Sequence, residues 1–291
     1  KGWGMTINDK ASKHIVCFSG GHSSGLVAIE VARRFGAENT ILLNHNISPL
    51  VELDDIKRFK QAVADYLNIE ITYANHSEWE TKTPIQVCID AKTWVNPANR
   101  QILCTHRLKT APFYEWLTNN YQHGDIAYYG FDRDETSRIT RRSQVMGQQG
   151  YKTDYPLALW ADRTINSTRE IGIEPPSAYS KFKHANCIGC LKAGWQHWYV
   201  VFCHYPTMWE ELKRGEDEIG YAVHGFDFAE DMEETFRQMQ AAGIPATEHI
   251  PSGRFWSSAK KAIKQGQLFS VVELPTVEQS VECTGDCRLS A

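Results

Sequence analysis

Two groups of residues in the sequence have the types and the spacing that chemistry requires, and the first is a short segment rich in glycine and serine. Residues 19–25 read Ser-Gly-Gly-His-Ser-Ser-Gly, without the lysine of a Walker loop. Glycine lets a backbone come close to a phosphate, and the amide groups at the start of a helix favour an anion. Ser23 or Ser24 could cap such a helix or bind a phosphate oxygen. We therefore expect a phosphate-binding loop, with a plain turn before a helix as the alternative, from Ser19, Gly20, Gly21, His22, Ser23, Ser24 and Gly25.

The second group consists of cysteines, of which the chain has eight. Cys187 and Cys190 have the Cys-x-x-Cys spacing of a metal-binding hairpin, and converging thiolates suit a [4Fe–4S] cluster or a structural Zn²⁺. Soft thiolates without histidines at zinc-finger spacing favour iron and sulfur over zinc. Zinc, or two thiols without a metal, is the other interpretation. Cys17 lies in an apolar run, and we expect it to be a small buried side chain.

Strands and helices alternate in the part of the chain that must position these residues. Short apolar runs, typical of buried parallel strands, occur at residues 14–18, 40–43, 70–73 and 126–129. A helical pattern ends at Gly36, and an amphipathic helix is expected over 54–67. This alternation predicts an α/β fold with a parallel, Rossmann-like sheet, whose ligands bind at the carboxyl ends of the strands. Asn44 follows the second strand there, and it either contacts a ribose or base or only turns the chain.

The periodicity changes after the third expected strand. Residues 75–100 contain two prolines and are expected to form a long loop with little regular structure. Later in the chain, residues 195–214 read as helical with a break at Pro206, and residues 228–242 read as a second helix.

Length, charge and composition limit the possible classes of protein. A chain of 291 residues allows one large domain with an appendage, and we divide it into a nucleotide-binding domain over 1–195 and a helical region over 196–291. The formal net charge of −4 gives no general attraction to polyanions, so a nucleic acid would need a local basic patch. No apolar run has the length of a membrane span, and no export signal is visible, so we expect no membrane partner and thiols in a reducing cytoplasm.

Four segments occur in one order along the chain. They are SGGHSSG at 19–25, CTHRLKTAPF at 104–113, GFDRDETSR at 130–138, and PLALW at 156–160 followed by CIGC at 187–190. This order resembles that of the phosphoadenosine-phosphosulfate reductase branch of the PP-loop ATP pyrophosphatase superfamily. The resemblance covers roughly residues 14–195, about two-thirds of the chain. Each segment is short, but their joint order is specific, and it implies the adenine nucleotide alpha-hydrolase-like fold of this superfamily with a mostly helical extension.

The resemblance implies that ATP or a related adenylyl nucleotide binds with Mg²⁺ at the carboxyl edge of the sheet. Gly130 would join the loop at 19–25 in contacting the nucleotide, and Arg133 and Arg138 would bind phosphate or sulfate, which planar guanidinium groups match well. Glu135 would orient an arginine or help to hold Mg²⁺, and a solvated ion network is the alternative for all three charged residues. The family usually carries Asp where this chain has Ser23, which puts Mg²⁺ binding by the loop in doubt.

The resemblance also bears on the cysteines. In iron–sulfur members of this branch, the segment that matches Cys104 supplies a cluster thiolate, so Cys104, Cys187 and Cys190 are the expected ligands. We expect Cys203, one short helical segment beyond the pair, as the fourth ligand ahead of His106. Three ligands alone would leave an open iron that could carry a sulfide for transfer.

The implied activity is ATP-dependent sulfur insertion, as in the PP-loop thiolation enzymes, which include the DNA phosphorothioation sulfurtransferases. ATP would adenylylate an acceptor and release pyrophosphate, and sulfur from the cluster or a persulfide would then displace AMP. We expect as partners a sulfur donor such as a cysteine desulfurase and other subunits of a modification system. DNA or RNA is a candidate acceptor because of the basic residues Arg138, Arg141, Arg142, Lys260, Lys261 and Lys264.

Two other functions stay open. A sulfonucleotide reductase would use Cys283 to attack the sulfate sulfur, and thioredoxin would later release sulfite. The tail that holds Cys283 and Cys287 shares only its Glu-Cys start with the catalytic segment of those reductases, and it is equally a mobile thiol pair or a disordered end. A non-catalytic nucleotide-binding subunit would bind nucleotide without turnover.

Overall fold

The computed structural model describes residues 12–75, 77–98, 100–185, 187–225 and 227–266, which form two compact units. Unit 1 contains the described residues as far as Asn44, together with Phe59–Tyr73 and Trp116–Glu174. Unit 2 contains His45–Arg58, Ala74–Glu115 and the described residues from Pro175 onward.

Unit 1 is built on a parallel sheet of five strands in the order β3-β2-β1-β4-β5. The strands are β1 (His14–Cys17), β2 (Thr40–Asn44), β3 (Ile71–Tyr73), β4 (Ile126–Tyr128) and β5 (Lys152–Asp154). At the centre of the sheet, Ile15 is paired with Ile41 on one side and Ala127 on the other. The predicted α/β class and parallel sheet are therefore confirmed. The polar edge strand β5, Lys-Thr-Asp, has no apolar run that would have revealed it.

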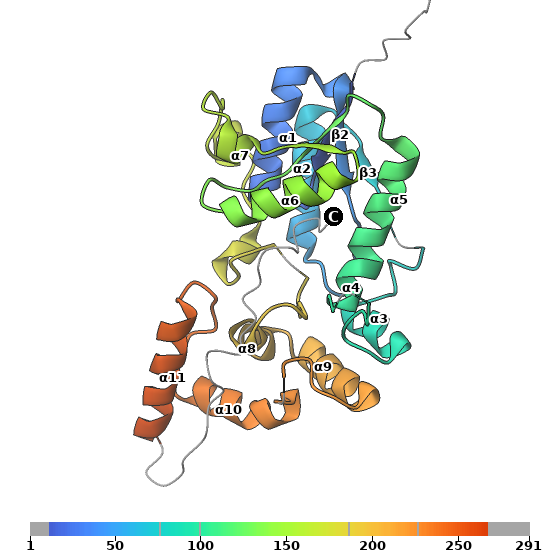
Figure 1. The fold of residues 1–291 in the computed structure, drawn as a ribbon. Coiled ribbons are helices and arrows are strands. Elements are labelled where there is room, and N and C mark those ends of the chain that lie inside the picture. Colours follow the sequence, from blue (N-terminus) through green and yellow to red (C-terminus); the bar gives the residue numbers. More distant parts are fainter. Residues whose placement is uncertain (1–11, 76, 99, 186, 226, 267–291) are drawn as a thin grey trace, which may run out of the picture. The chain divides into compact units, whose positions relative to one another are not determined.

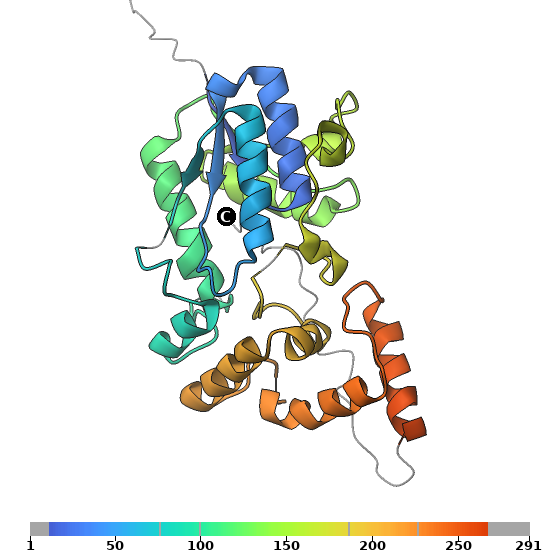
Figure 2. The same cartoon turned by 180° about the vertical axis from the view of Figure 1, so that it is seen from behind.

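Helices cover both faces of this sheet (Figure 1 and Figure 2). Helix α1 (His22–Phe35) and the unit 1 part of α2 (Asp54–Leu67) lie on one face, and α6 (Thr136–Gln148) lies on the other. Right-handed crossovers require this change of face, because the chain adds strands in one direction from β1 to β3 and in the opposite direction from β4 to β5. The connections after β1 and β4 therefore diverge, and the carboxyl ends of these neighbouring strands border the crevice where such sheets bind ligands.

Apolar side chains from the sheet and its helices form the core of unit 1. Val16, Phe18, Val27, Phe59 and Val63 are all completely buried in it. The remaining short elements of unit 1 are η1 (Ala37–Asn39), α7 (Pro156–Leu159) and η3 (Thr168–Ile171).

Unit 2 is helical in its described part. Its elements are α3 (Pro84–Ala91), α4 (Leu103–Thr105), a π-helical turn η2 (His106–Thr110), the start of α5 (Ala111–Asn120), η4 (Ser177–Ser180), α8 (Trp195–His204), α9 (Pro206–Ile219), α10 (Ala229–Ala241) and α11 (Ser252–Gly266). The predicted break at Pro206 is confirmed, since proline has no N–H for an interior helical bond and begins α9 instead. The prediction of a loop with little regular structure over 75–100 is wrong for α3, where Thr83 caps the helix by accepting a hydrogen bond from the Gln86 amide.

Aromatic side chains fill the core of unit 2. The ring of Phe236 lies 5.4 Å from that of Trp209 and 5.3 Å from that of Tyr199, measured between centroids. Residues that precede position 195, including Ile85 and Leu103, share this core with the C-terminal helices. The predicted domain boundary at residue 195 therefore does not coincide with the limits of unit 2. No helix in the described ranges is long and apolar enough to cross a membrane.

Candidate nucleotide loop and cysteine pocket

The predicted phosphate-binding loop lies directly after β1, at the carboxyl edge of the sheet in unit 1. Gly20 has a φ of 82°, which favours glycine, and α1 begins at His22 without a side-chain cap from any described residue. The buried Ser24 hydroxyl donates to the Gly21 carbonyl at 2.8 Å and accepts from the Ser19 hydroxyl at 3.2 Å. Ser24 therefore stabilises the loop from inside the protein, whereas Ser19 and Ser23 are partly exposed.

Gly130 brings the second predicted nucleotide segment against this loop. A Cβ atom added at Gly130 would lie 3.1 Å from the carbonyl carbon of Ser23 and 3.1 Å from the nitrogen of Ser24. Only glycine fits at this distance without a shift of the backbone. The two segments, separated by more than 100 residues in the sequence, thus meet where the connections after β1 and β4 diverge.

The charged residues after Gly130 are tied to one another. The Arg138 guanidinium forms an ion pair with Glu135 and lies 4.3 Å from the centroid of the Phe131 ring. The second carboxylate oxygen of Glu135 accepts the Asp132 amide at 2.8 Å. Glu135 thus has protein partners at both oxygens, which favours the arginine-orienting role over Mg²⁺ binding. Arg133 is exposed.

Asn44 is used inside the protein. Its side chain is 1 % exposed, donates to the Phe18 carbonyl and accepts a hydrogen bond from the Lys60 ammonium at 3.3 Å. Between the two alternatives for Asn44, this geometry favours a structural role, because both ends of the amide are occupied. Lys60 is itself 1 % exposed, and sequence reasoning missed it. The signal was present, since Lys60 follows Phe59 on the apolar face of α2.

His22, at the start of α1, accepts a hydrogen bond at Nε2 from the Thr168 amide at 3.2 Å. Burial and the nearby Arg169 lower its pKa. The neutral imidazole therefore supports the η3 segment with Nε2 and does not offer that atom to a phosphate.

Three cysteines line one pocket in unit 2. The pocket, called here the cysteine pocket, is lined by Pro84, Cys104, Thr105, Leu108, Lys109, Cys187, Cys190, Leu191 and Lys192. The three cysteines come from segments that are about 80 residues apart and are each less than 10 % exposed. The structure therefore brings together three of the four thiols that sequence reasoning grouped as ligands. Two lysines at the same pocket were not predicted, and cationic side chains favour the thiolate form of cysteine.

Two irregular elements hold these thiols. Cys104 precedes the π-helical turn, in which the Ala111 amide donates to the His106 carbonyl five residues back. Cys187 and Cys190 flank a tight turn in which Gly189 has a φ of 70° and the Ile188 amide donates to the Val51 carbonyl at 2.8 Å.

The other cysteines lie elsewhere. Cys203 is on α8, is not among the residues that line the cysteine pocket, and forms a hydrogen bond with the Tyr199 hydroxyl. Burial raises the pKa of its thiol and raises that of Cys17 to about 12, which confirms Cys17 as a small buried side chain. Cys88 is buried and directs its thiol at the Trp94 carbonyl. Cys283 and Cys287 lie outside the described residues.

The donor set of the cysteine pocket matches the predicted metals by type, because thiolates bind both iron–sulfur clusters and Zn²⁺. Among the described residues, however, no three His, Cys, Asp or Glu side chains are grouped closely enough to hold a metal ion. No disulfide joins the described cysteines either. The prediction of a metal at this pocket therefore depends on the types of its donor residues and not on their spacing in the structure.

Comparison of the chain with models of protein families, with curated proteins and with solved structures finds no match.

Proposed function

We propose that the protein is an ATP pyrophosphatase of the PP-loop type that activates an acceptor with ATP and inserts sulfur into it. The proposal rests most on the cysteine pocket, because three thiols beside two lysines form an arrangement that a protein limited to nucleotide binding does not need. The nucleotide part is supported by the contact between Gly130 and the backbone of Ser23 and Ser24.

In the first step, an oxygen of the acceptor would attack the α-phosphorus of ATP, and the bond to pyrophosphate would break. The backbone amides at the start of α1 would bind the phosphates. Arg133 would neutralise charge that develops on them, and Arg138 would do so from the position that Glu135 fixes.

In the second step, sulfide (HS⁻) that the sulfur donor supplies, held at the cysteine pocket, would attack the acceptor atom that carries the activated oxygen and form the new carbon–sulfur or phosphorus–sulfur bond. AMP would leave with that oxygen. Lys109 and Lys192 would stabilise the anionic sulfur before the attack. A [4Fe–4S] cluster, or Zn²⁺, bound by Cys104, Cys187 and Cys190 would keep these sulfurs in the thiolate form.

Nucleic acid is the acceptor class that we propose. Helix α11 exposes the ammonium-bearing side chains of Lys260, Lys261 and Lys264, which form a local basic patch on a chain with a net negative charge. The sulfonucleotide reductase depends on Cys283, which lies outside the described residues, so no described contact favours it.

The test is an anaerobic purification of wild-type protein, Cys187→Ser and Cys203→Ser, with a visible spectrum, assays for iron, zinc and acid-labile sulfide, and separation of the products of ATP. We expect conversion of ATP to AMP and pyrophosphate in the presence of nucleic acid. Cys187→Ser should lose sulfur transfer and any bound cluster, whereas Cys203→Ser should keep both because Cys203 does not line the pocket.

Three results would contradict the proposal. Sulfite release from an adenylyl sulfate would identify a reductase. Nucleotide binding without turnover in anaerobically purified protein would identify a non-catalytic subunit. Equal loss of sulfur transfer in Cys187→Ser and Cys203→Ser would show that the pocket is not the sulfur site.

A further inference from the structure

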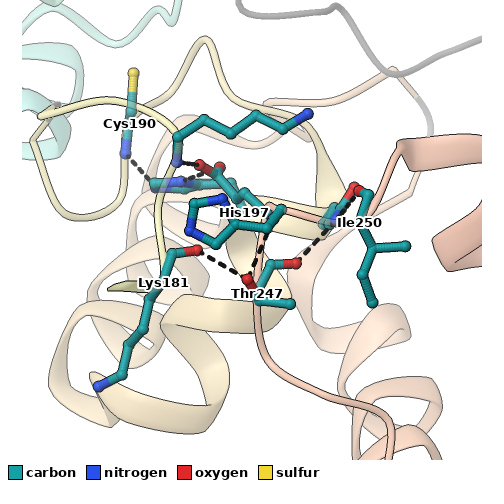
Figure 3. A network of polar contacts seen from close by, with 9 residues as sticks. Lys181, Cys190, His197, Thr247 and Ile250 are labelled. Atoms are coloured by element: carbon teal, nitrogen blue, oxygen red, sulfur yellow. Dashed lines mark hydrogen bonds and ion pairs between the residues drawn. The ribbon is translucent and has the colours of Figure 1, made fainter. Parts of the chain in front are cut away.

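The loop between α10 and α11 is bonded to the segment that leads into the Cys187–Cys190 turn (Figure 3). The Glu248 amide donates to the Lys181 carbonyl at 2.9 Å, and a carboxylate oxygen of Glu248 accepts the Lys183 amide at 2.8 Å. Gln196, on α8, donates to the carbonyls of Thr247 and Ile250, both at 2.9 Å. Hydrogen bonds thus connect this loop both to the segment that precedes Cys187 and to the first turn of α8.

His197 extends these contacts to a cysteine. Its Nδ1 lies 2.8 Å from the second carboxylate oxygen of Glu248, and its Nε2 lies 3.3 Å from the Cys190 backbone nitrogen. The imidazole is 4 % exposed and lies against the Phe182 ring, with centroids 5.0 Å apart. In Figure 3 the sulfur of Cys190 points away from this imidazole, so His197 acts on the backbone of Cys190.

The partners determine which imidazole nitrogen carries the proton. The backbone N–H of Cys190 can only donate, so Nε2 of His197 must accept it and carries no proton. An ionised carboxylate only accepts hydrogen bonds, so Nδ1 of His197 must donate. Both partners thus indicate the same tautomer, with the proton on Nδ1 and the acceptor at Nε2.

We propose that His197 is a positioning residue of the cysteine pocket, and that Glu248 fixes the imidazole so that its Nε2 holds the Cys190 amide and thereby directs the Cys190 thiol. The inference deepens the proposed function, on which its importance for sulfur transfer depends. The positioning itself is a property of the turn that can be measured without turnover.

The test uses the full-length chain and follows the turn in two ways. Hydrogen exchange with mass spectrometry reports the Cys190 amide, and iodoacetamide alkylation compares Cys190 with Cys203 in the same molecule. His197→Phe keeps a ring but removes the acceptor, and the loss of one hydrogen bond should speed exchange of the Cys190 amide by about tenfold. Alkylation of Cys190 relative to Cys203 should rise as well.

Gln196→Leu is the matched control. It breaks the bonds to the Thr247 and Ile250 carbonyls at the same loop but leaves the bond between His197 and Cys190, so the Cys190 amide should exchange nearly as in wild type. His197→Gln, whose amide oxygen can accept the same N–H, should restore most of the protection lost in His197→Phe.

Glu248→Gln keeps the test decisive if His197→Phe does not fold. It replaces the charged partner of Nδ1 by a neutral amide and should speed exchange of the Cys190 amide by about threefold. Unchanged exchange in both His197→Phe and Glu248→Gln would overturn the inference, and so would an equal increase in Gln196→Leu. If exchange behaves as expected while sulfur transfer is absent from the wild type, only the proposed function fails.

Discussion

The predicted phosphate-binding loop of unit 1 and the cysteine pocket of unit 2 are held in place by different kinds of interaction. The loop follows β1, and the register of a parallel sheet places it beside the segment that follows β4. The cysteine pocket takes its thiols from a π-helical turn and a tight turn, and the second of these is bonded to a loop about 60 residues further along the chain. Backbone pairing therefore determines the first site, whereas a few polar side chains determine the second.

Two glycines express this difference at single positions. Gly130 is needed because backbone atoms of Ser23 and Ser24 lie within 3.3 Å of where its Cβ would be. Gly189 is needed because its φ is 70° and because side chains of Met208 and Trp198 surround it. A backbone neighbour cannot move aside cheaply at Gly130. At Gly189 the Met208 side chain can move in part, but the Trp198 ring and the positive φ still exclude a side chain.

The largest loss of stability is expected from Gly189→Ala. If this variant were as stable as wild type, the cysteine turn would not depend on a glycine at this position. The positive φ costs an L-residue about 1–2 kcal/mol, and crowding against Met208 and Trp198 adds to this cost. We expect the free energy of unfolding to fall by about 2–3 kcal/mol in urea titrations. Cys187 and Cys190 should also become more reactive toward iodoacetamide.

Gly220→Ala is the control, since Gly220 also has a positive φ, of 87°, but has open space around its Cβ position. It should cost only about 1 kcal/mol and leave both thiols unchanged. Equal losses in the two variants would mean that packing contributes nothing at the cysteine turn.

A smaller loss of stability, with a specific loss of binding, is expected from Gly130→Ala. Its Cβ would press on the predicted phosphate-binding loop and cost about 1–2 kcal/mol. Calorimetric titration with ATP should show affinity reduced by roughly tenfold or more, while alkylation of the cysteine pocket stays as in wild type. Gly147→Ala, in α6, where a Cβ would have no atom within 4 Å apart from the nearby backbone of its own helix, should bind ATP normally and be slightly more stable. Wild-type affinity in Gly130→Ala would refute a ligand site at this edge of the sheet.

The smallest predicted effect is a loss of stability at low pH. It would sharpen the comparison, because we expect polar side chains to contribute more to the structure of unit 2 than to that of unit 1. Hydrogen bonds from Lys213 and Arg237 lower the pKa of Glu233 to about 2, whereas an unfolded chain has a pKa near 4.3 for glutamate. A lowered pKa stabilises the fold above the unfolded value, and this contribution is lost as the pH falls toward 2.

Glu233→Gln should therefore lower the free energy of unfolding at pH 7 by about 1 kcal/mol, given the partly exposed setting of the pair. The difference in the free energy of unfolding between Glu233→Gln and wild type should become smaller as the pH falls from 5 to 2, as measured by urea titrations at each pH. Asp162→Asn, which removes the exposed pair with Arg34 in unit 1, should have a smaller effect. If this difference in the free energy of unfolding stays constant with pH, the ion pairs of Glu233 do not stabilise unit 2.

The sequence predicts unit 1 better than unit 2, because backbone pairing between strands leaves a local pattern in the sequence and contacts between distant polar side chains do not. In unit 1, apolar runs in the sequence predicted four of the strands. Gly130 was predicted from a sequence motif, and the fold places it beside Ser23 and Ser24. The buried Lys60 was missed because an ammonium on an apolar helix face is rare and its partner Asn44 belongs to another element. In unit 2, the Cys-x-x-Cys spacing identified the pair, but nothing local relates His197 to Glu248, which are 51 residues apart. Cys203 was grouped with Cys187 and Cys190 because it follows the pair closely, yet it lies one helical turn after its partner Tyr199 on α8 and does not line the pocket.

The π-helical turn His106–Thr110 fixes the direction of Cys104 relative to the start of α5. A π turn holds one residue more than an α-helical turn, so it accommodates that residue without rotating the chain on either side of it. If residues 103–120 kept every residue and closed into an uninterrupted α-helix, the extra residue would instead add about 100° of rotation between Cys104 and α5. A change from π-helical to α-helical bonding in this one turn, with every cysteine still in the sequence, would in this way remove one thiol from the pocket.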